Sequence, residues 1–201
     1  MKEERDYIQD LAEIRSMMER SSKFLSLSGW AGIMAGIYAL LGAWVAHHYL
    51  EFRPDAFLYS SPYLHRTVIV ATGILISALV TAIYFSRKKA ENNGEKAWNL
   101  TSRRMLLNML VPLFSGGLLI AVLVYQGFQG LIAPMTLIFY GLALFNASNF
   151  TIKEVKYLGQ TQIILGILNC WFIESGLFFW AIGFGAAHLI YGIYMYFRYE
   201  R

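Results

Sequence analysis

Cysteine and charge are both scarce in this sequence. Cys170 is the single cysteine among 201 residues, which excludes an internal disulfide and a metal site built from several thiolates. Charged residues make up 15% of the chain, against about 25% in a typical soluble domain. Because 57% of the residues are hydrophobic, the composition predicts an integral membrane protein.

Long stretches of the chain carry no charge at all. None occurs from residue 105 to residue 152, which is too long for one membrane span of about 20 residues. The sequence YQGFQG at residues 125–130 supplies a turn that divides this stretch. We predict an all-α integral membrane protein, a compact antiparallel bundle of six transmembrane helices over residues 24–197, followed by a tail at 198–201. The predicted spans cover residues 24–50, 67–86, 105–125, 131–148, 157–173 and 175–197.

Lysine and arginine are distributed unevenly between the loops. If the spans alternate in direction, 15 of the 17 basic residues fall on one side of the membrane, and only Arg53 and Arg66 fall on the other. The positive-inside rule then places both termini in the cytoplasm. We expect the protein in a bacterial cytoplasmic membrane, with lipid headgroups and not nucleic acid facing its basic residues.

Residues 1–23 precede the first span and combine acids and bases with a periodic apolar pattern. Apolar positions recur three and four residues apart, which is typical of an amphipathic helix. They are Tyr7, Leu11, Ile14, Met18 and Leu25. Two interpretations stay open: this cytoplasmic helix lies on the membrane surface or its own bundle, or it binds a cytoplasmic or membrane protein partner. Small residues in the first span, including Gly32-x-x-x-Gly36, indicate close helix packing and leave a homo-oligomer open.

Polar residues inside the spans are few, and no acid or lysine lies deep in any of them. That absence argues against a proton- or sodium-coupled carrier, which needs ionisable groups at mid-membrane. Counted from the turn before residue 175, His188 and Gln162 lie at the same depth and are expected to form a hydrogen bond. We predict a polar site of His188, Gln162, Asn169 and Tyr191. The alternative is a purely structural pair, in which neutral His188 packs two helices together.

A second group of ionisable residues gathers at the opposite, extracytoplasmic ends of the spans. Its members are His47, His48, Glu51, Asp55, His65 and Glu174. Imidazoles and carboxylates titrate near neutral pH and bind divalent metals. However, adjacent residues such as His47 and His48 project about 100° apart on a helix. We therefore predict no metal at this outer cluster.

No catalytic or phosphate-binding motif occurs in the sequence. We therefore expect no enzymatic activity, no catalytic residue and no cofactor. The functional hypothesis is a scaffold, regulatory or sensing subunit that acts through partner proteins. The alternative is a small channel or carrier for a neutral small solute, with its pocket around His188 and Gln162.

Overall fold

The computed structural model describes residues 23–52, 63–94 and 96–201. Nearly all of the predicted N-terminal helix at 1–23, and Asp55 of the predicted outer cluster, lie outside these ranges. Within them all regular structure is helical and no strand occurs. The prediction of an all-α fold is confirmed.

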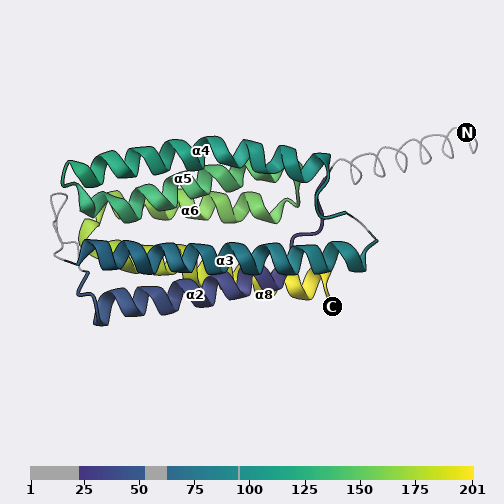
Figure 1. The fold of residues 1–201 in the computed structure, drawn as a ribbon, viewed down its shortest axis with the longest axis horizontal. Helices are drawn as coiled ribbons and strands as arrows, with labels where there is room; N and C mark the ends of the chain where they lie inside the picture. The colour runs from purple at the N-terminus through teal and green to yellow at the C-terminus, as the bar shows by residue number, and fades with distance from the viewer. Residues whose placement is uncertain (1–22, 53–62, 95) are drawn as a thin grey trace, which may run out of the picture.

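Six helical stretches run along the long axis of the molecule (Figure 1). The sixth is a continuous run in which a π-helical segment joins two α-helices. The α-helices are α2 (Gly29–His48), α3 (Leu64–Asn92), α4 (Leu100–Tyr125), α5 (Ile132–Ala147), α6 (Glu154–Trp171), α7 (Gly176–Trp180) and α8 (His188–Tyr199), and the π-helix is η4 (Ala181–Ala187). Three short 3₁₀ turns are η1 (Gln129–Leu131), η2 (Ser148–Phe150) and η3 (Ile173–Ser175).

Five stretches within the described ranges are long and apolar enough to cross a membrane. They are Gly29–His48, Leu64–Asn92, Leu100–Tyr125, Gln129–Phe150 and Ile173–Tyr199. The remaining helix, α6, has 18 residues but is diluted by Lys156, Gln160 and Gln162. Its role as a sixth span stays a prediction.

The helices form two groups joined by the sixth stretch (Figure 1). In one group α5 packs between α4 and α6, and in the other α2 packs between α3 and α8. Segments α7 and η4 contact both groups, because they touch α2, α5 and α6. The residues from Gly176 to His188 therefore link the two groups, and Gly176, Gly183, Gly185 and His188 among them are buried.

Helix α3 extends six residues beyond the span predicted at 67–86. Its polar last turns continue the helix to Asn92, and the chain reverses at Gly94, whose φ of +68° suits a residue without a side chain. Helix α4 likewise begins before residue 105, because Asn99 caps it. The Asn99 side chain accepts from the Ser102 amide at 2.8 Å, and Ser102 Oγ accepts from the Asn99 amide at 2.9 Å. Hydropathy detects the span, whereas capping sets the helix end.

Helices α2 and α8 meet backbone against backbone through glycines. A Cβ atom placed on Gly29 would lie 2.6 Å from the carbonyl oxygen of Gly192. A Cβ atom on Gly192 would lie 2.6 Å from the carbonyl oxygen of Gly29 and would also collide with the amide nitrogen of Ile33. Small residues permit this approach, and in lipid such packing replaces the hydrophobic effect between helices.

The Glu200 carboxylate binds the same end of this helix pair. The Gly29 amide donates to Glu200 Oε1 at 2.7 Å, and Lys89 Nζ lies 3.1 Å from the same oxygen. Ser28 Oγ donates to Glu200 Oε2 at 3.4 Å. The carboxylate thus satisfies a free N–H at the positive end of α2 and pairs with a cation from α3. We call Ser28, Gly29, Lys89 and Glu200 the Glu200 clamp.

Candidate functional site

His188 lies where η4 meets α8, and both of its ring nitrogens have partners. Nδ1 lies 2.9 Å from the carbonyl oxygen of Gly183, and Nε2 lies 2.9 Å from the hydroxyl of Tyr140 on α5. Because a carbonyl oxygen only accepts, Nδ1 carries the proton, and Nε2 of the neutral ring accepts from Tyr140. The surroundings therefore hold His188 in one tautomer.

Gln162 on α6 approaches the same carbonyl from the other side. Its Nε2 donates to the Gly183 oxygen at 2.7 Å and lies 3.5 Å from His188 Nδ1. Since both nitrogens carry protons here, they are two donors that share one acceptor. A Cβ atom on Gly183 would lie 2.5 Å from Gln162 Oε1 and would also collide with Leu137 Cδ2, so a side chain at this position would require both neighbours to shift. We call Tyr140, Gln162, Gly183 and His188 the polar cluster.

Aromatic rings cover the cluster on one side. Phe184 stacks on His188 with ring centroids 5.9 Å apart and an interplanar angle of 11°, and it lies 5.1 Å from the Tyr140 ring. Trp180 follows at 4.9 Å from Phe184. His188 itself is buried. The rings therefore shield one side of the polar cluster, and Gln162 and His188 are buried, so their hydrogen bonds are stronger than in water.

Two amide oxygens on α6 have no hydrogen-bond partner in the described part of the chain. They are Gln162 Oε1 and Asn169 Oδ1, both on fully buried side chains. The two residues are seven positions apart, about two helical turns, and so share one face of α6. Asn169 Nδ2 donates to the Gly176 carbonyl at 3.4 Å. Each unpaired oxygen carries a desolvation cost of about 1–3 kcal/mol.

The four residues of the predicted polar site are only partly brought together. His188 and Gln162 meet at one carbonyl. Asn169 lies two turns away, and Tyr191 packs against the apolar cluster of buried residues that includes Met195. Sequence reasoning missed Tyr140, the direct partner of His188. Tyr140 lies near the middle of the span predicted at 131–148, and this depth is the sequence feature from which its contact with His188 could have been predicted.

The described residues of the predicted outer cluster include two histidines whose rings are in contact. The His47 and His48 rings meet edge to face with centroids 5.0 Å apart, and His48 Nδ1 lies 3.2 Å from the Trp44 carbonyl oxygen. His65 lies in the first turn of α3, and Glu174 lies in η3. In residues 23–52, 63–94 and 96–201, no three His, Cys, Asp or Glu side chains are placed to hold a metal ion.

The hydrogen bonds of the polar cluster do not form a path for proton transfer between side chains. The Tyr140 hydroxyl donates to His188, and the other ring nitrogen donates to a backbone carbonyl, which cannot pass a proton on as a side chain can. The hydrogen bonds instead connect α5, α6 and the η4–α8 junction. The arrangement is that of an interhelical polar contact.

Fold and cluster together define an all-helical chain with several apolar helices compatible with membrane spans and a hydrogen-bonded polar centre. Comparison with models of known protein families, with curated proteins and with solved structures gives no match for this chain.

Removing the Tyr140 hydroxyl tests the central contact. Tyr140→Phe leaves His188 Nε2 buried without a donor, so we expect the free energy of unfolding to fall by about 1–3 kcal/mol. Denaturant unfolding in detergent micelles measures this loss. Tyr157→Phe, at a side chain that is 67% exposed, is the control and should change little. Equal losses in the two variants would contradict the Tyr140–His188 hydrogen bond.

Proposed function

We propose that the chain is a six-span membrane protein with both termini in the cytoplasm. The weakly apolar α6 fits this proposal, because its polar residues Gln162 and Asn169 are fully buried and do not meet lipid. The positive-inside rule supports the orientation. Among the described residues, every Lys and Arg except Arg66 lies at the end of the bundle where α3 finishes and α4 begins. A bacterial cytoplasmic membrane remains the expected location.

We further propose that the protein has no catalytic or transport activity and acts through partner proteins, as a scaffold, regulatory or sensing subunit. The observation that carries this proposal is the closed polar cluster, in which both nitrogens of His188 are occupied by groups of the chain itself. A solute site needs polar groups that face a cavity, and here they face one another. The proposed partners are a cytoplasmic or membrane protein, bound through the amphipathic segment at 1–23, and a second copy of the chain.

Access of water to the polar cluster tests this proposal. In a Cys170→Ser background we expect neither Leu137→Cys nor His188→Cys to react with a membrane-impermeant thiol reagent from either side of sealed vesicles. Leu137 is fully buried beside Gly183, so Leu137→Cys leaves every hydrogen bond of the cluster in place. Tyr125→Cys, at a position that is 89% exposed, is the positive control and should react from the extracytoplasmic side alone.

A channel or carrier for a neutral small solute is the second candidate. The unpaired oxygens of Gln162 and Asn169 favour it, because a buried acceptor without a partner attracts a donor from water or from a solute. Labelling of Leu137→Cys from either side would overturn the partner-based proposal and support this one. Solute flux that changes in Gln162→Ala or His188→Ala would then place the pathway at the cluster.

A further inference from the structure

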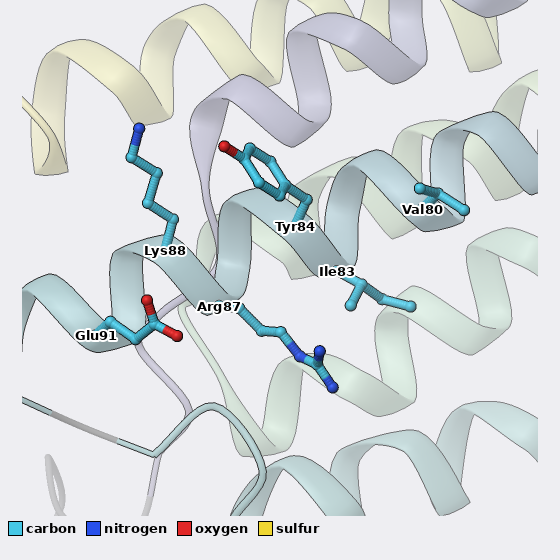
Figure 2. A pocket seen from close by; sticks show the side chains of 6 residues that line it. All are labelled: Val80, Ile83, Tyr84, Arg87, Lys88 and Glu91. Carbon is cyan, nitrogen blue, oxygen red and sulfur yellow. The ribbon is translucent and has the colours of Figure 1, made fainter.

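The most apolar of the membrane-compatible windows lies in α3, yet none of that window is buried. In the whole helix Ala90 is the single buried residue. Near its C-terminal end the surface of α3 carries a furrow of about 590 Å³. Figure 2 shows the six side chains that line it, which are Val80, Ile83, Tyr84, Arg87, Lys88 and Glu91.

The furrow runs between two rows of side chains spaced four residues apart. Tyr84 and Lys88 extend to one side of the helix, and Ile83 and Arg87 extend to the other (Figure 2). Residues four apart lie one above the other on a helix. With all six lining residues included, one row is Val80, Tyr84 and Lys88, and the other is Ile83, Arg87 and Glu91. The two cations therefore lie at neighbouring levels on opposite sides of the furrow, and Glu91 follows Arg87 in the second row.

Charge changes along the furrow in a fixed order. The apolar part around Val80 comes first, the cations Arg87 and Lys88 follow, and Glu91 lies about 6 Å further along the helix axis at 1.5 Å per residue. In the part of the chain that the structure describes, none of these three charged side chains has an ion-pair partner. The neighbouring Lys89, by contrast, is bound in the Glu200 clamp. The three charges on the furrow are therefore open to a ligand.

We propose that this furrow binds a phospholipid with a primary-amine headgroup from the cytoplasmic leaflet, of the phosphatidylethanolamine type. Such a lipid carries an acyl chain, then an anionic phosphate, then an ammonium group. That sequence complements the apolar, cationic and anionic parts of the furrow. Guanidinium and ammonium groups bind phosphate oxygens by charge-assisted hydrogen bonds, and a carboxylate accepts from an ammonium N–H. This inference rests on the proposed membrane insertion and orientation.

Glu91 distinguishes this lipid from other lipids that share the phosphate. Phosphatidylglycerol presents a neutral glycerol to Glu91, whose hydroxyls can donate a hydrogen bond but carry no positive charge to pair with the carboxylate. Phosphatidylcholine carries a quaternary ammonium with no N–H, so it cannot donate a hydrogen bond to Glu91. A phosphate site alone would need only Arg87 and Lys88. The carboxylate beyond them selects the primary amine.

Lipid retention by the full chain tests the proposal. The protein is first reconstituted in vesicles with equimolar phosphatidylethanolamine, phosphatidylcholine and phosphatidylglycerol of identical acyl chains. It is then exchanged into detergent, and the lipids that stay bound are quantified by mass spectrometry. We expect at least about fivefold enrichment of phosphatidylethanolamine over phosphatidylcholine, since one charge-assisted hydrogen bond distinguishes them.

Three variants separate the contributions of the furrow. Glu91→Gln removes the charge but keeps an amide oxygen that accepts a hydrogen bond, so it should reduce the preference for phosphatidylethanolamine over phosphatidylcholine. Arg87→Gln combined with Lys88→Gln should lose both lipids. Arg103→Gln combined with Arg104→Gln removes the same charge from exposed positions of α4 and should behave as the unaltered protein. Equal enrichment of the two lipids by the unaltered protein would overturn the proposal, as would loss of lipid in the α4 control.

Enrichment of phosphatidylglycerol that Glu91→Gln leaves unchanged would overturn the choice of lipid. Failure of the proposed membrane insertion is recognised separately, because a chain released from the vesicles by alkaline carbonate is not integral. That result would overturn the proposed function and this inference together. A chain that resists carbonate but shows no lipid preference overturns this inference alone.

Discussion

Replacement of Gly192 by alanine is expected to lower the free energy of unfolding by about 1–3 kcal/mol, as overpacking of a close contact does. The added methyl group would lie 2.6 Å from the Gly29 carbonyl oxygen and would collide with the Ile33 amide nitrogen. Both obstacles are backbone atoms, which cannot rotate away as a flexible side chain can. The α2–α8 pair must therefore separate, and denaturant unfolding in detergent micelles should report the loss.

Two other helical glycines provide the matched control. Cβ atoms on Gly73 of α3 and Gly117 of α4 would meet nothing within 4 Å. Since alanine is favoured over glycine inside a helix by about 0.8–1.0 kcal/mol, Gly73→Ala and Gly117→Ala should leave stability unchanged or raise it. If Gly192→Ala matched these two variants, the backbone contact between α2 and α8 would be refuted.

Loss of the Glu200 carboxylate is expected to be the second large effect. Glu200→Ala leaves the Gly29 amide without its acceptor and leaves Lys89 Nζ without its ion-pair partner, although Lys89 Nζ still donates to the Leu27 carbonyl oxygen at 2.7 Å. The Lys89 and Glu200 side chains are each only 13% exposed. An unpaired, partly buried cation and a free helix N–H together should lower the free energy of unfolding by about 1–3 kcal/mol. The same micellar unfolding experiment measures it, with the exposed Glu174→Ala as the control.

A second substitution shows whether loss of the Lys89–Glu200 ion pair causes the fall in unfolding free energy. Lys89→Met removes the cation but keeps an apolar side chain of similar length. If the unpaired charge causes the loss, Glu200→Ala combined with Lys89→Met should be less damaging than the sum of the two single changes. Strict additivity, or a Glu200→Ala variant as stable as Glu174→Ala, would show that the clamp contributes nothing.

The helical class of the fold was predictable because the apolar runs are long and their turns are marked by residues such as Gly94. The length of α3 was not predictable from the apolar runs. The apolar run ends at residue 86. Because neither Arg87 nor Lys88 disfavours helical backbone, α3 continues through a polar segment to Asn92. The start of α4 depends on the side chain of Asn99, a capping interaction that a hydropathy profile does not contain.

The polar cluster was predictable only as far as depth along a span can be counted. Counting placed His188 level with Gln162, and the structure places both at one carbonyl. It could not identify Gly183 as that carbonyl, because the π-helical turn that contains it has no signature in the sequence. Nor could it identify Tyr140, since that contact requires knowing that α5 lies against η4 and α8.

The pairing of α2 with α8 also constrains the order in which the molecule can be assembled. These helices are in direct contact, yet Gly29 and Gly192 are separated by almost the whole of the described chain. Domains emerge from the ribosome N-terminus first. If the chain inserts as proposed, α2 must wait in the bilayer until α8 has been made, with its glycine surface against lipid or against a temporary helix of another protein.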